Sequence, residues 1–524
     1  MGTQPLELVP ATPGSSATSS HDPAVEAERT LVDPQFPYRE HVTGSLAAHP
    51  AEAPLFQPAY SPYSQSGYQP QPLYPGYPVG YAPYAGHLAY PGYPPYAWQP
   101  PRPKRDAYLL TIDILSLIGS SLVLLVGLGL TFVGLLLAIF PMNTMKSNEL
   151  FSGAVLLVSI ICTGVFGGSF GLYHSIRALM RKPSAAFELP WFWTFLVLYL
   201  AVIGIGFWLH SQGQDLAFPL LSVVLILLAG LFPALAVLAL GVRRLRIRAA
   251  KPQKTTWPTT WRRVTLALLS GATLSVMLAY ILETALLAVL VLLTHTPGMQ
   301  NLASCVNTPA APGCQNPAAY GLILLTLALV APLVEETVKP LAVVVLIGRV
   351  RSAVEAFALG LACGIGFDLV ETSGYISLGY RDWLNVALLR TGAGLLHGFG
   401  AAIVALGWYY LVHAKELGYG KAFLRAFACW FYAVLQHAIW NGSVSLALLP
   451  APIGPFFQRA VNLGFTSLPS FIIVNIVEVL FMLAFFVYLT GRLRTKSASP
   501  PSPTPASGKH KVETSPGQPV GALM

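Results

Sequence analysis

The chain has 524 residues, of which 54% are hydrophobic and only 10% are charged. Soluble domains carry about 25% charged residues, so this composition excludes a soluble domain and predicts an all-α polytopic membrane protein. The net charge of +9 arises from basic residues in short loops between apolar stretches, which indicates topology signals and contacts with the lipid bilayer and no nucleic-acid partner.

Low-complexity segments occupy the two ends of the chain. Residues 1–105 contain repeats of Tyr, Pro and Gly, such as Tyr74-Pro75-Gly76-Tyr77-Pro78. A segment of this kind has no apolar periodicity and cannot bury a core, which predicts a disordered tail. Residues 495–524 are rich in Pro and Ser and form a second predicted disordered tail.

Ten apolar stretches lie between the tails. Each is long enough to cross about 30 Å of hydrocarbon as a helix. In chain order they cover residues 110–140, 152–174, 190–209, 218–241, 264–293, 319–347, 353–378, 385–412, 422–448 and 469–490. The sequence therefore predicts about ten transmembrane helices.

Basic residues are concentrated in alternate loops, for example Arg243, Arg244 and Arg246 after the fourth span. The positive-inside rule then places both termini in the cytoplasm of a protein of the cell membrane. On this topology the loop that contains Cys305 and Cys314 lies outside, where a disulfide between them is expected.

Ionisable residues interrupt the sixth to ninth spans. Glu335 and Glu336 lie at the middle of the sixth, and Glu371, His397 and His437 follow in the next three. An ionised group near the bilayer centre costs about 2.5–3.5 kcal/mol, so such residues persist where they satisfy one another and usually where they have a function. Because successive spans alternate in direction, all five residues reach a common depth.

Helical spacing supports this convergence. His437 and Asn441 are four residues apart and share a helix face. Arg390 lies seven residues before His397 on one stripe, where it can pair with a carboxylate. No motif includes the other acidic residues in or near the spans, which we interpret as packing or interface residues: Asp113, Glu283, Asp368 and Glu478.

Four ordered motifs summarise the polar residues of these spans. They are Glu335-Glu336-x-x-Lys339, Phe367-x-x-x-Glu371, Arg390 through His397-Gly398, and His437-x-x-x-Asn441. Together they resemble the PrsW family of intramembrane proteases, which is similar to the clan of CAAX prenyl endopeptidases and bacteriocin-processing enzymes. The chain departs from the family pattern at Asn441, where Asp is commoner, and at Thr372, where Asn is commoner.

The resemblance implies an endopeptidase that hydrolyses a peptide bond of a membrane-anchored protein. By this analogy Glu335 activates the water, and Glu336 is a second base or an orienting group. His397 and His437 bind either a metal or the oxyanion, while Asn441 donates a hydrogen bond to the oxyanion or orients His437. A zinc site made by His397, His437 and Glu371 is one alternative, and Glu371 as a structural partner of Arg390 is another.

The resemblance also divides the chain. Residues 106–318 form the first five transmembrane helices, residues 319–448 the PrsW-like catalytic helices, and residues 449–494 the final transmembrane region. A proton- or ion-coupled transporter is the alternative function, because buried carboxylates and histidines also form relays. The first half of the chain lacks the second glutamate pair that inverted repeats would predict. A third alternative is an inactive scaffold that recruits partners through its Tyr/Pro-rich tail.

Overall fold

The computed structural model describes residues 106–139, 147–212, 219–247, 256–294, 317–378, 382–447, 449, 452–464 and 467–498. The N-terminal tail, residues 499–524 of the C-terminal tail and the Cys305/Cys314 loop lie outside these residues. Nearly all of the described chain is helical. Its helices and strands, in chain order, are α1 (Ala107–Ile139), α2 (Ser147–Cys162), η1 (Thr163–Gly167), α3 (Gly168–Leu179), α4 (Phe192–Ser211), α5 (Pro219–Leu245), α6 (Trp261–Ser270), η2 (Gly271–Ser275), α7 (Val276–Thr294), α9 (Pro317–Leu325), η4 (Thr326–Val330), α10 (Ala331–Val338), α11 (Leu341–Leu346), η5 (Ile347–Arg349), α12 (Ala353–Leu378), α13 (Trp383–Leu389), η7 (Arg390–Gly392), α14 (Ala393–Val412), α15 (Ala414–Leu417), α16 (Tyr419–Ala447), α17 (Ile453–Gln458), β1 (Ala460–Asn462), β2 (Ser467–Pro469) and α18 (Ser470–Ala498).

Among the described residues, ten helical spans are long and apolar enough to cross a membrane. This confirms the predicted number, and the chain is an all-α integral membrane protein. The bounds differ by a few residues, because the helices continue into the polar residues that flank each apolar stretch. The sixth span, for example, covers Tyr320–Arg349 and not 319–347. The last helix reaches Ala498, so residues 495–498 of the predicted C-terminal tail are helical.

Helices α12 and α14 form the centre of the bundle, and most of their residues are buried. Glycines permit this close packing, as small residues do at helix crossings in membranes. A Cβ atom at Gly364 of α12 would overlap the backbone carbonyl of His397 on α14. Beside this crossing, Phe357, Phe399 and Phe486 pack with ring centroids 5.4 to 6.2 Å apart. The rigid centre therefore fixes the position of the α14 backbone at His397.

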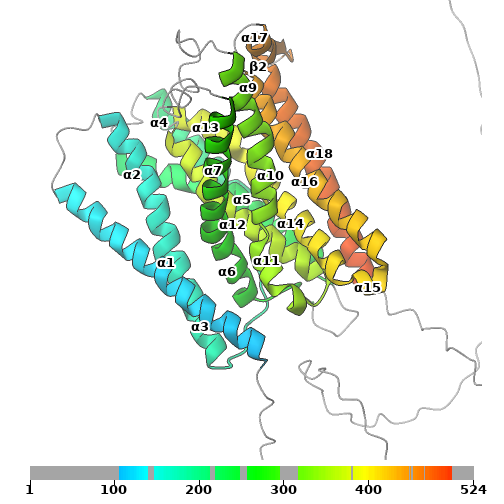
Figure 1. Cartoon of the computed structure of the whole chain (residues 1–524). Coiled ribbons are helices and arrows are strands. Elements are labelled where there is room, and N and C mark those ends of the chain that lie inside the picture. Colours follow the sequence, from blue (N-terminus) through cyan, green and yellow to red (C-terminus); the bar gives the residue numbers. More distant parts are fainter. Residues whose placement is uncertain are drawn as a thin grey trace, which may run out of the picture. The chain divides into compact units, whose positions relative to one another are not determined.

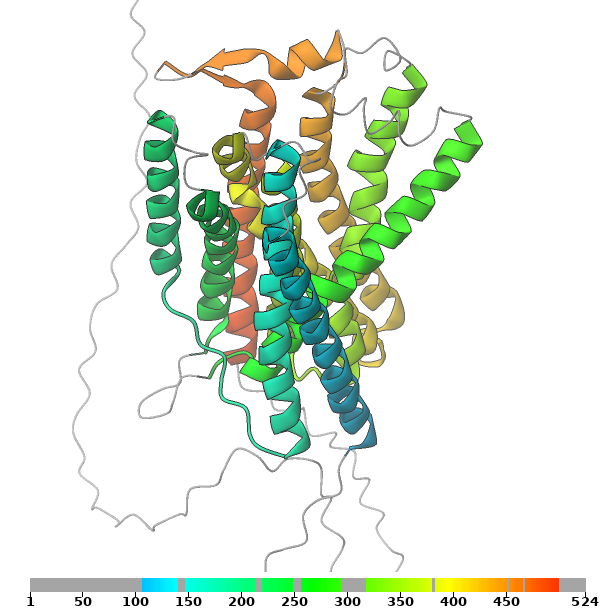
Figure 2. The same ribbon diagram turned by 90° about the vertical axis from the view of Figure 1, so that its left-hand side faces the viewer.

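The outer helices are less buried. Figure 1 shows α1 with α2 and α3 at one edge of the bundle, and α16 with α18 at the opposite edge. Helix α7, bright green in Figure 2, packs beside α10 and diverges from α9 toward the top of that view. A hairpin of β1 and β2 pairs Ala460 with Pro469 and leads from α17 into α18.

Candidate active site

Two breaks make α10, which carries the glutamate pair, a separate short helix. A π-helical turn, η4, precedes it, and Pro340 follows it before α11 begins. Pro340 ends the helix because its ring lacks an N–H and clashes with the carbonyl four residues earlier. Asn441 of α16 donates from Nδ2 to the carbonyl oxygen of Leu327 in the π-turn (3.0 Å). The side chain of a neighbouring span therefore holds the turn that leads into α10.

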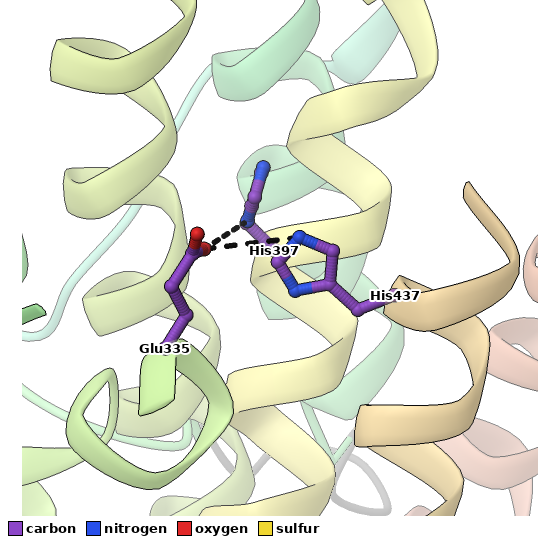
Figure 3. Close-up of side chains that lie close together, drawn as sticks. All are labelled: Glu335, His397 and His437. Atoms are coloured by element: carbon purple, nitrogen blue, oxygen red, sulfur yellow. Dashed lines mark ion pairs between the residues drawn. The ribbon is translucent and has the colours of Figure 1, made fainter. Parts of the chain in front are cut away.

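The structure brings Glu335, His397 and His437 together from three helices (Figure 3). Glu335 Oε2 lies 3.9 Å from His397 Nδ1 and 3.8 Å from His437 Nε2. The two imidazole rings are perpendicular, with centroids 5.1 Å apart. All three side chains are almost fully buried, with 6%, 0% and 1% of their surface exposed. The predicted convergence at one depth is thus present for these residues.

The second nitrogen of His437 faces another carboxylate. His437 donates from Nδ1 to Glu336 Oε1 at 2.8 Å. Lys339 Nζ lies 2.6 Å from the same oxygen and 2.9 Å from Glu335 Oε2. Lys339 is fully buried and also lies over the ring of Phe367 at 4.6 Å. One lysine therefore balances both glutamates and holds Glu336 against His437.

The second nitrogen of His397 also faces a carboxylate. His397 Nε2 lies 2.8 Å from Glu371 Oε2, and an Arg390 Nη2–Glu371 ion pair at 3.3 Å fixes that carboxylate. Arg390 in turn lies over the ring of Tyr375 at 4.6 Å. Of the two alternatives for Glu371, the ion pair with Arg390 is present, and the same carboxylate contacts the imidazole of His397.

Two further polar residues belong to this layer. Asp368 was interpreted from the sequence as a packing residue, and Gln436 was not predicted as part of the site. Asp368 is buried, accepts a hydrogen bond from Thr372 (2.8 Å) and lies 4.0 Å from Arg390. Gln436 donates to Leu396 O (3.1 Å). The signal that could have found both is position, since Asp368 lies three residues before Glu371 and Gln436 lies next to His437.

Gly400 provides space for Glu336. A Cβ atom at Gly400 would lie 2.6 Å from Glu336 Oε2 and 3.0 Å from Gln436 Nε2. The distance of 2.6 Å is shorter than real Cβ contacts, so a larger residue at this position would displace the carboxylate end of Glu336. Gly364 of α12 thus permits the helix crossing, and Gly400 of α14 gives room to the site.

The central three residues fit a metal ion. One ligand atom from each of Glu335, His397 and His437 can be chosen so that all three lie within 4.8 Å of one another. His397 Nδ1 has no hydrogen-bond partner among the described residues, and His437 Nε2 has only Asn441 Nδ2 at 3.3 Å. Two imidazoles and one carboxylate are a donor set that suits zinc with an open position. The predicted set contained Glu371, which lies instead on the far nitrogen of His397.

A comparison with known families identifies the segment that contains these residues. Residues 259–487 match the model of the PrsW family intramembrane metalloproteases. The match covers every residue of the candidate site. The predicted resemblance and the predicted protease activity are confirmed. No curated protein and no solved structure matches the chain.

The PrsW segment is wider than the four motifs indicated. It begins at residue 259, before α6, and ends in α18, whereas the motifs predicted catalytic helices only from 319 to 448. The fifth span, α6 to α7, therefore lies inside the family segment.

Proposed function

We propose that Glu335, His397 and His437 form the centre at which this intramembrane protease hydrolyses a peptide bond of a membrane-anchored protein. The observation that supports the proposal is the arrangement of the two imidazoles. Each turns one nitrogen toward Glu335 Oε2, and a different carboxylate holds its other nitrogen. Carboxylate partners of this kind orient histidines in hydrolytic metal sites.

Glu335, His397 and His437 would hold a zinc ion. When bound, the ion would polarise the scissile carbonyl and ease the loss of a proton from water. Glu335 turns one oxygen toward the imidazoles, and its carboxylate accepts the proton of the attacking water. If the histidines bind the oxyanion and no metal, Glu335 still has to accept the proton of the attacking water.

The surrounding residues hold this geometry. Glu336, together with Lys339, fixes the orientation of His437, and Glu371, together with Arg390, fixes that of His397. Asn441 connects His437 to the π-turn through its amide. Fixed partners of this kind reduce the reorganisation that the site needs during the reaction.

A membrane protein is the substrate that fits the place of this centre best. The site lies among helices long and apolar enough to span a membrane, which favours entry of the scissile segment from within the bilayer. We place the catalytic helices at 319–448 with the fifth span added, and we place both termini in the cytoplasm by the positive-inside rule.

Loss of cleavage on changing Glu335→Gln is the first expected result. The amide keeps the shape of the side chain but accepts no proton, so the rate should fall about 100-fold or more. The measurement is product formation from a panel of tagged single-span proteins in cells, at equal expression. Glu478→Gln is the matched control, because Glu478 is a buried carboxylate of α18 outside the cluster. Equal cleavage by wild type and Glu335→Gln would refute the assignment.

Metal content gives a second expected result, independent of cleavage. Purified wild type should bind about one zinc ion per chain, and His437→Ala should bind none, because a three-ligand site loses a ligand. Glu371→Gln should weaken zinc binding about 10- to 100-fold, since it removes the partner of His397. Chelator competition with elemental analysis measures both. Zinc content that is equally low in wild type and His437→Ala would favour the oxyanion role of the histidines.

A further inference from the structure

Glu283 is an acidic residue of α7 that none of the four motifs includes. It belongs to a stripe with four-residue spacing that faces α10, formed by Ser275, Ala279 and Glu283. Ser275 donates from Oγ to Val338 O at 3.0 Å. One turn further along, Ala279 belongs to a buried cluster with three residues of the neighbouring helices: Val334, Val338 and Phe367. The next turn of the same stripe brings Glu283 to the level of the site.

The directions of the two helices make Glu283 and Glu335 converge. Residues later in the sequence of the fifth span contact residues earlier in α10, so the two helices are antiparallel. Side chains of an α-helix lean toward its N-terminus. Glu283 therefore leans toward the level of Glu335, and Glu335 leans toward Glu283. In agreement, Glu283 lies within electrostatic range of Glu335, Glu371 and Lys339.

Among the described residues, Glu283 differs from the other outer carboxylates of the layer because no hydrogen bond or ion pair involves it. Within the described part of the chain, its Oε1 is buried and accepts no hydrogen bond. The other outer carboxylates each have partners: Glu336 contacts His437 and Lys339, Glu371 contacts His397 and Arg390, and Asp368 contacts Thr372. An unsatisfied carboxyl group in a membrane span is expensive, and its place beside the polar layer of the site, which Glu478 on α18 does not share, indicates a function there.

We propose that Glu283 is a further catalytic residue, the carboxyl group that gives a proton to the leaving nitrogen. The inference rests on the proposed function of Glu335. Water adds its oxygen to the scissile carbonyl carbon and loses a proton to Glu335. As the C–N bond breaks, the nitrogen takes a proton from Glu283. The proton on Glu335 then passes to Glu283, so the water has been divided between the acyl and amine products and both residues are restored.

The test compares Glu283→Gln with wild type on a synthetic single-span peptide that the wild type cleaves. Glutamine keeps the size and hydrogen-bonding capacity of the side chain but transfers no proton, so kcat should fall about 100-fold or more. KM should change less than about threefold, because substrate contacts are retained. Glu478→Gln, the control with a buried, unpartnered carboxylate on α18, should keep kcat within about twofold. A raised KM with unchanged kcat in Glu283→Gln would overturn the proposal.

A change of leaving group separates proton donation from a structural role. In the same peptide with the scissile amide replaced by an ester, the alkoxide leaves with less need of a proton. The defect of Glu283→Gln should then shrink to less than about tenfold. An equal defect on amide and ester, or a loss of zinc from the purified variant, would show a structural role and overturn the inference. If Glu335→Gln abolishes cleavage while Glu283→Gln is fully active, the inference alone fails; full activity of both variants would refute the proposed function as well.

Discussion

Replacement of Lys339 by Met is expected to remove about 3–5 kcal/mol from the free energy of unfolding, because it leaves buried carboxylates without their counter-charge. Lys339 is fully buried and lies 2.9 Å from Glu335 and 2.6 Å from Glu336. Methionine retains most of the apolar stem, so the loss reports the charge and its hydrogen bonds. Cleavage should disappear with it, since Glu336 no longer holds His437.

Thermal unfolding of the purified protein in detergent measures this effect. Lys415→Met is the matched control, since Lys415 lies exposed in the short α15 segment and its change should stay within about 0.5 kcal/mol. Adding Glu336→Gln to Lys339→Met should restore part of the lost stability, because one uncompensated charge is removed. If Lys339→Met and Lys415→Met unfold at the same temperature, the ion pairs of Lys339 with Glu335 and Glu336 do not stabilise the fold.

Gly364→Ala is expected to have the second large effect. A Cβ atom at Gly364 would overlap the carbonyl oxygen of His397, which is backbone and cannot rotate away. Helices α12 and α14 must then separate, at a cost of about 1–3 kcal/mol in unfolding free energy. The separation moves His397 away from Glu371, and a misplacement of about 1 Å lowers the cleavage rate about 100-fold.

The control for this substitution lies on the same helix. Gly374 also belongs to α12, and a Cβ atom there would meet no atom within 4 Å. Gly374→Ala should keep cleavage near the wild-type rate and gain up to about 1 kcal/mol from the better helix propensity of alanine. Cleavage rates and unfolding temperatures of both variants, measured side by side, test whether the methyl group at Gly364 separates the two helices. Equal behaviour would show that the α12–α14 crossing tolerates a methyl group at Gly364.

The spans and their polar layer were accessible from the sequence for energetic reasons. Apolar stretches of sufficient length specify helices in a bilayer, and buried charges have to meet one another there. The spacing of Glu335 and Lys339 predicts an ion pair on one helix face, and the structure contains it. These inferences need only the periodicity of a regular helix and the alternation of span directions.

The rotation of each helix about its axis was not accessible in this way. Glu335 and not Glu371 faces both imidazoles, and this depends on how η4 and Pro340 orient the short helix α10. The residues of the π-turn, Thr326–Val330, are ordinary helix residues, so nothing in them signals the extra residue. Glu283 was assigned to packing because it belongs to no motif, and its approach to the layer depends on how α7 is placed against α10.

The π-turn before α10 also has an evolutionary consequence. A π-turn contains one residue more than the α-helical turn that would replace it, and each residue of an α-helix advances by about 100°. Deleting one residue from Thr326–Val330 would therefore convert the π-turn into an α-helical turn and leave the faces of α9 and α10 nearly in place, whereas a deletion within α9 itself would turn the preceding residues by roughly that angle. Descendants of the protein can therefore lose one residue at this turn and keep the outer surface of the sixth span, which a deletion elsewhere in the span would change. Such changes would leave the glutamate pair untouched.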